Sequence, residues 1–355
     1  MSKKFRRTTI QDVADRAGVS KSSVSRALNG SVEQNPETTQ RILKIIENLD
    51  YVPARSAQSL AHGRTLAVAL LVPAGMWWEW TLEIMRGIHD ELERLGMTLT
   101  LVSCGTDSES QEVLARRLTH SHLVDGLIAI IPSKMIDLLK RLESEGVSVV
   151  LIDESEDRPP FSAVRVDNRT GSRDGVKHLL ATTPGKIAFL GEKNLPVSKQ
   201  RLMGYKDALV SENRVVESSL IGFGDETVES GRVAMKKILE RHDDISAVFC
   251  SRDRLAVGAL RAIQEAGYTV PDQISILGFD DSEVVRATYP PISVVNQPLR
   301  QVGTAAAKMM HAKLDGKENT DLIVLPTSLI ERGTTKVENN KTNKTKKTNK
   351  TEREG

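Results

Sequence analysis

Apolar residues in the first fifty positions recur three and four residues apart, which is the spacing of helices that each bury one side. The pattern predicts three short helices. Their inward-facing residues are Ile10, Val13, Ala14 and Ala17 in the first, Val24, Ala27 and Leu28 in the second, and Ile42, Leu43, Ile46 and Leu49 in the third. We therefore predict a compact helical domain over residues 1–52.

Residues that start and stop helices stand at the ends of these three segments. Thr9 and Ser20 are suited to cap the first and second helices, and Asn35 followed by Pro36 is suited to open the third. Gly18 lies where the first helix must end, because glycine readily adopts the left-handed conformation of a helix terminus. The first two helices then form a helix-turn-helix motif over about residues 10–29.

The second helix carries polar and basic residues on the side that the apolar pattern leaves exposed. Lys21, Ser22, Ser23 and Arg26 can donate hydrogen bonds to base edges and phosphates in a DNA major groove. The alternative is an ordinary three-helix bundle with a solvated basic face. The polar second helix and the basic N-terminal arm favour a DNA-binding domain.

Residues 65–335 alternate short apolar runs with amphipathic segments. The runs predict buried strands at Leu66–Val72, Thr98–Val102, Gly126–Ile131, Val147–Ile152, Ala163–Val166, Lys186–Leu190, Ser218–Gly222, Ala247–Cys250, Ser275–Gly278 and Ser293–Val295. The amphipathic segments predict helices at Leu82–Leu95, Glu109–His120, Met135–Glu145, Thr170–Leu180, Gln200–Glu212, Glu226–Arg241, Asp253–Ala266 and Leu299–Leu314. Such alternation indicates an α/β fold with parallel sheets covered by helices, and a ligand cleft at the carboxyl ends of the strands.

Residues 53–64 join the two regions and predict a marginal hinge helix. Pro53 ends the third helix, and Ala54–Ala61 is too short to be a stable helix alone in water. DNA and a second subunit together would stabilise it. Leu60 would then be exposed and able to wedge between base steps in a minor groove, or alternatively to anchor the linker on the body.

The charges divide in the same way as the hydrophobic pattern. Residues 1–64 hold 11 Lys and Arg against 6 Asp and Glu, whereas residues 65–335 hold 31 against 38. Residues 336–355 repeat Lys, Thr and Asn, and this composition predicts a disordered basic tail. A basic head on an acidic body is typical of a polyanion-binding module joined to a sensor domain.

Other sequence features narrow the class of protein. The absence of a long apolar segment and of a signal-peptide pattern leads us to expect a cytoplasmic protein. Cys104 and Cys250 lie in strand-like runs, and we expect them to be buried thiols. No catalytic or metal-ligand spacing is found, and Gly222-Phe-Gly224 lacks the third glycine of a dinucleotide motif. We therefore expect no enzyme activity, cofactor or metal.

The chain resembles the LacI–GalR family of bacterial transcription regulators from residue 8 to about residue 335. The motifs that carry the resemblance are Thr9-Ile-Gln-Asp-Val-Ala, Ala17-Gly-Val-Ser, Val24-Ser-Arg and Tyr51-Val-Pro. It implies that Lys21, Ser22 and Arg26 read operator bases, that Asn29 contacts the DNA backbone, and that Leu60 opens the central step of a palindrome. Our predicted set of DNA contacts also includes Thr9, Ser20, Ser23 and Ala57.

The resemblance also implies a body of two lobes, related to periplasmic sugar-binding proteins. Trp77, Trp78 and Trp80 follow the first strand, where flat rings would suit the apolar faces of sugars, although core or interface packing is the alternative. The family usually has Asn-Pro followed by two aromatic residues in this loop. The loop of this chain differs and is one residue longer.

Charged residues at strand ends complete the predicted effector site. Arg201 matches the family's ligand arginine, with a surface salt bridge as the alternative, and Asp280 matches its hydroxyl acceptor. Asp153, at another strand end, is a weaker candidate. Arg252 stands where the family usually has Asn, and this cation favours an effector with an acidic group. The predicted ligand is a sugar, an oligosaccharide or a sugar acid.

These features together predict a regulator, most simply a repressor, that binds a pseudo-palindromic operator as a homodimer and responds to a small effector. The basic tail has no leucine heptads of the kind that join dimers into tetramers. A corepressor, which would tighten DNA binding, is a variant of this hypothesis. A solute-binding module without DNA function and an enzyme acting on sugars or nucleosides are the alternatives.

Overall fold

The computed structural model describes the chain over residues 8–28, 35–51, 64–73, 79–105, 107–120, 123–130, 135–153, 159–193, 195–225, 227–317 and 321–336. The chain divides into two compact units. One comprises residues 1–66 with 122–125, and the other comprises residues 67–121 with 126–355. We call the helical part of the first unit the headpiece and the second unit the body.

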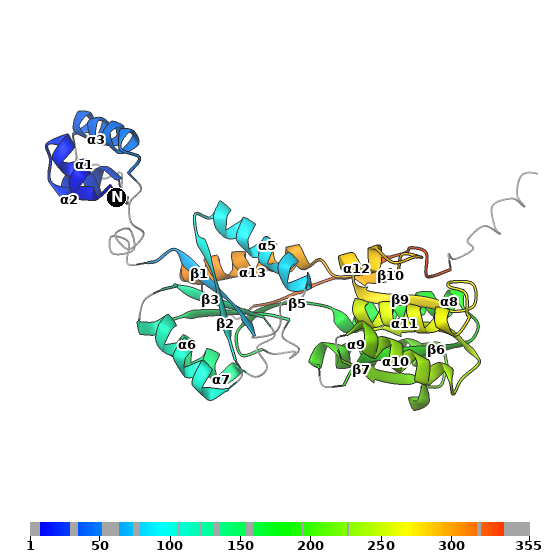
Figure 1. Cartoon of the computed structure of the whole chain (residues 1–355). Coiled ribbons are helices and arrows are strands. Elements are labelled where there is room, and N and C mark those ends of the chain that lie inside the picture. Colours follow the sequence, from blue (N-terminus) through cyan, green and yellow to red (C-terminus); the bar gives the residue numbers. More distant parts are fainter. Residues whose placement is uncertain are drawn as a thin grey trace, which may run out of the picture. The chain divides into compact units, whose positions relative to one another are not determined.

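The headpiece contains the three predicted helices, α1 (Ile10–Ala17), α2 (Lys21–Leu28) and α3 (Pro36–Asn48) (Figure 1). Thr9 caps α1 in a capping box with Asp12, and Asn35 accepts a hydrogen bond from the Glu37 N–H at 2.9 Å. Gly18 ends α1 with φ 63° and ψ 37°, the left-handed conformation predicted for it. The local sequence therefore sets both ends of α1.

A small apolar core joins the three helices. Val13, Val24 and Ile42 are fully buried in it. The prediction for Leu43 was wrong: this side chain is 44% exposed, and Ile45 packs on the core instead. Ile45 lies three residues after Ile42 and thus on the same side of the helix. Leu43 is the residue directly after Ile42, so its side chain points to a different side of the helix.

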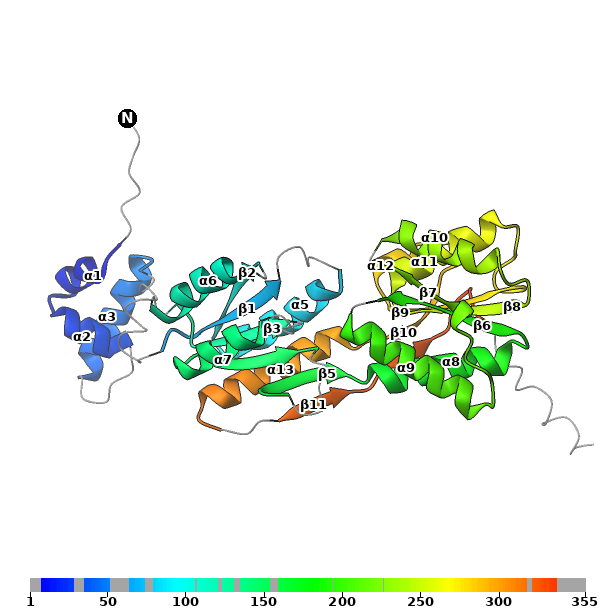
Figure 2. The same ribbon diagram turned by 90° about the horizontal axis from the view of Figure 1, so that it is seen from below.

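The body consists of two lobes, each built on a six-stranded sheet (Figures 1 and 2). The N-terminal lobe has the strand order β11-β5-β4-β3-β1-β2, all parallel. Its strands are β1 (Ala67–Pro73), β2 (Thr98–Cys104), β3 (Gly126–Ile130), β4 (Ser148–Ile152), β5 (Ser162–Val166) and β11 (Leu322–Leu325). Helices α5 (Glu79–Arg94) and α13 (Leu299–Leu314) cover one face, and α6 (Ser108–His120) and α7 (Ile136–Ser144) cover the other.

The C-terminal lobe repeats this arrangement with the order β12-β10-β9-β8-β6-β7. Its strands are β6 (Lys186–Glu192), β7 (Ile221–Gly224), β8 (Ile245–Cys250), β9 (Ser275–Asp280), β10 (Ser293–Asn296) and β12 (Ser328–Ile330), and only β12 is antiparallel to its neighbour. Helices α8 (Asn168–Thr182) and α9 (Pro196–Ser211) lie on one face. Helices α10 (Val228–Leu239), α11 (Asp253–Glu265) and α12 (Glu283–Arg286) lie on the other (Figure 2).

The chain passes between the lobes at Asp167, at Gln297–Pro298 and at Pro326–Thr327. As a result α13, which is late in the sequence, belongs to the N-terminal lobe. It packs on α5 at two glycines: a Cβ added to Gly303 would lie 2.1 Å from the Ile84 carbonyl oxygen, and one added to Gly87 would lie 2.0 Å from that of Arg300. Only glycine permits this approach of the two backbones.

The α/β fold with parallel sheets and a helix-turn-helix headpiece is confirmed, with local corrections. The run Ser218–Gly222 was predicted as strand, but a 3-10 turn occupies Ser218–Leu220 before β7 begins. Leu66 lies outside β1 and has φ 52°. The short elements β11, β12 and α12 were not predicted. Cys104 and Cys250 are buried free thiols.

Candidate functional site

Helix α2 presents its polar side chains to solvent and anchors its other side in the headpiece core. Lys21, Ser22 and Arg26 are exposed, whereas Val24 and Ala27 are buried. The Arg26 Nε donates to the Ser22 carbonyl oxygen at 3.3 Å, so the guanidinium lies along the helix surface. This face offers hydrogen-bond donors of the kind that read base edges.

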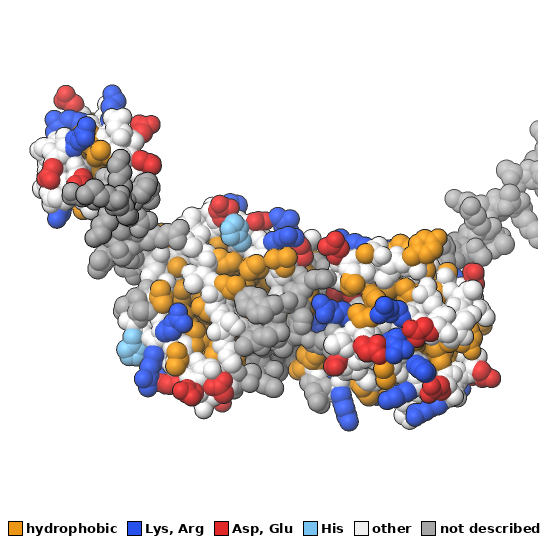
Figure 3. Space-filling view, in the orientation of Figure 1, with side chains coloured by type: hydrophobic (Ala, Val, Ile, Leu, Met, Phe, Trp, Pro, Cys, Tyr) orange, Lys and Arg blue, Asp and Glu red, His pale blue; other side chains and the backbone are white. Residues whose placement is uncertain are grey.

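Serine hydroxyls form the start of α2. Ser20 Oγ accepts from the Ser23 N–H at 3.2 Å, which is the predicted cap, and lies 2.7 Å from Ser22 Oγ. Ser23 is half-buried and its hydroxyl lies 3.0 Å from that of Ser20. Thr9 is exposed and donates its hydroxyl hydrogen to Asp12 Oδ2 at 2.7 Å. Figure 3 shows Lys and Arg side chains on the surface of the headpiece.

Several predicted DNA and effector contacts lie outside the described residues. These are Asn29, Ala57, Leu60, Trp77 and Trp78.

The remaining predicted effector residues come together where the two lobes face each other. Trp80, Asp153, Arg201 and Arg252 all line one nearly closed cavity of about 10 Å³, and Asp280 is paired with two of them. Trp80 and Asp153 belong to the N-terminal lobe, and the other three belong to the C-terminal lobe. Because most of these residues lie at or just after the carboxyl end of a strand, they meet at the sheet edges that face the cleft.

Arg201, in α9, is held from several directions. Its Nε donates to Asn168 Oδ1 at 2.8 Å, and a terminal nitrogen donates to the Ser251 carbonyl oxygen at 2.5 Å and lies 3.2 Å from Asp280 Oδ1. The guanidinium carbon is 3.7 Å from the centre of the Phe279 ring. Burial lowers the pKa of Arg201, and the Asp280 carboxylate opposes that effect. A surface salt bridge is wrong for this residue, because only 1% of it is exposed.

Arg252, directly before α11, has a partner that the sequence analysis missed. Its Nε lies 2.9 Å from Glu192 Oε1, and a terminal nitrogen lies 3.5 Å from Asp280 Oδ2. Glu192 is 5% exposed and also accepts from Ser251 Oγ at 2.7 Å. The available signal was a carboxylate at the end of the apolar run of β6. The guanidinium carbon of Arg252 lies 5.9 Å from the Trp80 ring centre, so this contact joins the two lobes.

Asp280, at the end of β9, is the carboxylate shared by both arginines. It has φ 114°, and the Gln297 side-chain amide donates to its Oδ1. Gln297 also lines the cavity and was missed because it lies in a connecting segment without a pattern. Asp153 has φ 64° at the end of β4, and its N–H donates to the Val164 carbonyl oxygen at 3.0 Å.

Asp253 lies beneath this group at the start of α11. Its Oδ2 accepts from the N–H and the hydroxyl of Ser282 at 2.6 and 2.7 Å. Burial, followed by the Asp280 charge, raises the pKa of Asp253 well above its usual range. The residue is 3% exposed and acts as support for the cleft.

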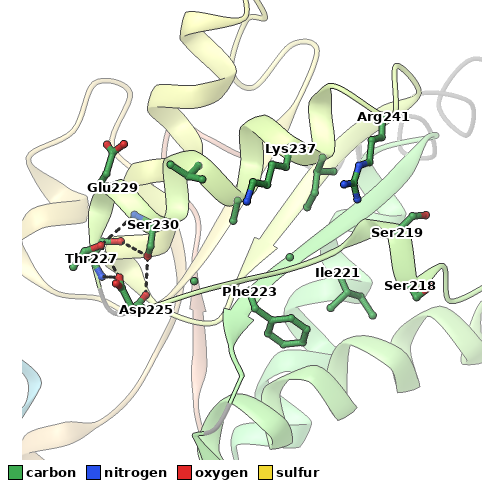
Figure 4. A pocket seen from close by; sticks show the side chains of 15 residues that line it. Ser218, Ser219, Ile221, Phe223, Asp225, Thr227, Glu229, Ser230, Lys237 and Arg241 are labelled. Atoms are coloured by element: carbon green, nitrogen blue, oxygen red, sulfur yellow. Dashed lines mark hydrogen bonds between the residues drawn. The ribbon is translucent and has the colours of Figure 1, made fainter.

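A larger cavity of about 460 Å³ lies along the edge strand β7 and α10 (Figure 4). At one end of it the Thr227 hydroxyl donates to Asp225 Oδ1 at 2.6 Å, and the Ser230 hydroxyl donates to the Asp225 carbonyl oxygen at 2.9 Å. No predicted effector residue lines it. Within the described part of the chain, no group of acidic, His or Cys residues is arranged to hold a metal, and no helix could span a membrane.

Comparison with known protein families identifies both parts of the chain. Residues 9–54 match the model for bacterial regulatory proteins of the lacI family. Residues 176–335 match the model for a periplasmic binding protein-like domain.

Curated relatives align over nearly the whole chain. The HTH-type transcriptional regulator CelR of Thermobifida fusca is 32% identical over 335 residues, covering 92% of this chain and 98% of CelR. Catabolite control protein A of Priestia megaterium is 30% identical over 334 residues, covering 92% of this chain and 99% of that protein.

Solved structures show the same architecture. A lac repressor dimer bound to operator and the anti-inducer ONPF has a TM-score of 0.82 at 26% identity, covering 93% of this chain and 99% of the repressor chain. A complex of the transcriptional regulator CelR with cellobiose has a TM-score of 0.68 at 30% identity, covering 92% of this chain and 100% of the CelR chain.

These matches confirm the prediction of a transcription regulator with a DNA-binding headpiece and a two-lobed body. They favour neither a solute-binding module without DNA function nor an enzyme. The chain belongs to the LacI family of bacterial regulatory proteins.

Proposed function

We propose that this protein is a repressor that binds a pseudo-palindromic operator as a homodimer in the bacterial cytoplasm and is released by a small sugar-like effector. The observation that carries the DNA half is the exposed donor face of α2, formed by Lys21, Ser22 and Arg26. The related lac repressor is a dimer on its operator, and the related CelR binds cellobiose. Both properties are carried to this chain as part of the proposal.

The proposed division of labour follows the sequence. Residues 1–52 bind DNA, 53–64 form the hinge helix, 65–335 bind the effector and dimerise, and 336–355 form a passive tail. Within the DNA-binding part, Thr9, Ser20, Ser23 and Asn29 support the readout by Lys21, Ser22 and Arg26. Ala57 and Leu60 act in the minor groove. The family-model matches at 9–54 and 176–335 support the separation of reader and sensor.

Effector control rests on the contact between Trp80 and Arg252. The distance of 5.9 Å between the guanidinium carbon and the ring centre is too short for a sugar ring to lie between them, because each face needs roughly 3.5–4 Å of van der Waals separation. An effector that stacks on Trp80 must therefore move the lobes. It shifts the equilibrium between operator-binding and released forms by its difference in affinity for the two.

A footprinting and gel-shift experiment with two matched arginine variants tests the DNA half. Arg26→Ala removes a charge from the proposed reading face, and Arg41→Ala removes one from the exposed surface of α3. Arg26→Ala should weaken binding to the footprinted operator by about 1–3 kcal/mol, roughly 5- to 150-fold, with little loss on random DNA. Arg41→Ala should weaken both DNAs slightly and equally.

Equal losses for the two variants would refute α2 as the reading helix. The sign of the effector response is read in the same assay. Release of operator on adding the sugar supports an inducer, and tighter binding would replace the inducer by a corepressor.

A further inference from the structure

Two charged residues in the cleft form a pair of their own. Glu192 ends β6 and Arg252 begins the turn into α11, and their side chains meet at 2.9 Å with 5% and 8% of each residue exposed. The Ser251 hydroxyl donates to the second Glu192 oxygen at 2.7 Å. One Glu192 oxygen is therefore held by a hydrogen bond, and the other contacts the Arg252 guanidinium as an ion pair without hydrogen-bond geometry.

The pair changes the charge that an effector meets. Asp280 compensates Arg201 at 3.2 Å, and Glu192 compensates Arg252 at 2.9 Å. Arg165 and Asp153 also line this cavity and add one charge of each sign, so the three described cations there are matched by three anions. A buried guanidinium that already has a carboxylate partner gains little from a second anion, because that anion would also face the first carboxylate.

We propose that Glu192 and Arg252 act together as a specificity pair that selects an uncharged polyhydroxyl effector and rejects its carboxylate analogues. This inference rests on the proposed effector site. Arg252 lines the cavity and can donate hydrogen bonds to sugar hydroxyls, whereas Glu192, only 5% exposed and outside the cavity lining, keeps the net charge of the pair at zero. Trp80, 5.9 Å from Arg252 and 8% exposed at the edge of the N-terminal lobe's core, supplies the flat apolar face that a sugar ring needs once the lobes have moved apart. The sequence predicted an effector with an acidic group from Arg252 alone. With Glu192 beside Arg252, the proposed effector is a neutral one.

Matched pairs of sugars test the selection in the wild-type full chain. The probes are glucose with glucuronate, galactose with galacturonate, and cellobiose with cellobiuronate, which differ within each pair by one carboxylate. Thermal shift and calorimetry at constant ionic strength measure binding. We expect at least one neutral sugar to bind, and to bind about tenfold or more tightly than its carboxylate partner.

Glu192→Gln removes the anion of the pair and leaves Arg252 with the Asp280 carboxylate that it shares with Arg201. Inorganic phosphate should then raise the melting temperature of this variant above the effect of sodium chloride at equal ionic strength, and should not do so for the wild type. The preference between neutral and carboxylate sugars should shift by about tenfold or more toward the carboxylate. The double variant Glu192→Gln/Arg252→Asn is the matched control and should lose the response to phosphate.

Three results would contradict the proposed role of Glu192 and Arg252 in effector specificity. One is a wild-type protein that prefers the carboxylate sugar, and another is a Glu192→Gln variant that responds to phosphate no more than the double variant does. The third is a wild-type chain that no neutral sugar stabilises. Failure of the proposed DNA-binding function would give a different result. It would appear as equal effects of Arg26→Ala and Arg41→Ala on operator binding.

Discussion

Polar side chains are held in opposite ways on α2 and in the inter-lobe cleft. On α2, Arg26 and the serines are bonded within four residues of sequence, and Arg26 is exposed. In the cleft, Arg201 and Glu192 are buried and bonded to partners 33 to 59 residues away. A substitution on α2 should therefore change DNA binding and leave stability almost unaltered. A substitution in the cleft should change both.

Arg201→Leu gives the largest expected effect. It leaves the Asp280 carboxylate buried with less compensation, and should lower the free energy of unfolding of the body by about 3–5 kcal/mol. Arg26→Ala should leave that free energy within about 0.5 kcal/mol. Urea unfolding followed by tryptophan fluorescence measures this, because all three tryptophans lie at positions 77–80 of the body. Similar losses in both variants would remove the contrast between the two sites.

Gly18→Ala should destabilise the headpiece alone. The left-handed conformation at φ 63° costs a non-glycine residue about 1–2 kcal/mol. Far-UV circular dichroism should show the headpiece helices unfolding earlier, with the tryptophan transition unchanged. Gly146→Ala is the matched control in the body, with φ 91° and open space around its Cβ position, and should shift the tryptophan transition while leaving the headpiece component of the circular dichroism signal unchanged. A shift of both transitions by either variant would show that the units unfold together.

Asp253→Asn should change how the stability of the body depends on pH. Burial raises the pKa of Asp253 in the folded protein, so the folded state keeps this proton while the unfolded state releases it above about pH 4. The wild type therefore loses stability as pH rises, by at most about 1.4 kcal/mol per pH unit from this group, until the folded pKa is passed. The asparagine variant should lack that component, and urea midpoints between pH 4 and pH 8 measure the difference. Parallel curves for the two proteins would contradict it.

Asp125→Ala should produce the smallest effect. It should weaken the coupling between effector binding to the body and operator binding by the headpiece. The Asp125 carboxylate accepts from the N–H groups of Thr65 and Leu66, both at 2.8 Å, and from the Thr65 hydroxyl at 2.9 Å. It thus fixes the backbone between the hinge and β1. The ratio of operator affinities without and with effector should fall severalfold while effector affinity stays unchanged. Asp243→Ala, at an exposed site, is the control, and an equal change in that variant would refute the role.

The difference between the two regions also explains how much could be predicted from sequence. Thr9, Gly18, Ser20 and Asn35 act on backbone within a few residues of themselves, so their roles were predicted correctly. Leu43 was misplaced because it stands next to Ile42 in an apolar run. The helical pattern alone does not decide which of these two adjacent residues faces the core.

In the body, long periodic helices and buried central strands were found, but the edge strands β11 and β12 were not. Each has only four or three residues, and their side chains are only partly buried, so no alternation marks them. Trp80, Asp153, Arg201, Arg252 and Asp280 lie close together, because parallel strands end at a common edge, and their role in effector binding stays a prediction. Glu192, Asn168 and Gln297 were missed, since their partners are set by tertiary contacts with no trace in local sequence.

The late position of α13 has a consequence for synthesis of the protein. Val302, Ala306 and Met310 of α13 complete the core of the N-terminal lobe, yet they leave the ribosome after every central strand of the C-terminal lobe. The headpiece has its own core and emerges first. During translation, the residues of the headpiece core are therefore all present on the nascent chain before the core of the N-terminal lobe is complete. The DNA-binding headpiece is thus synthesised before the body that is proposed to control it.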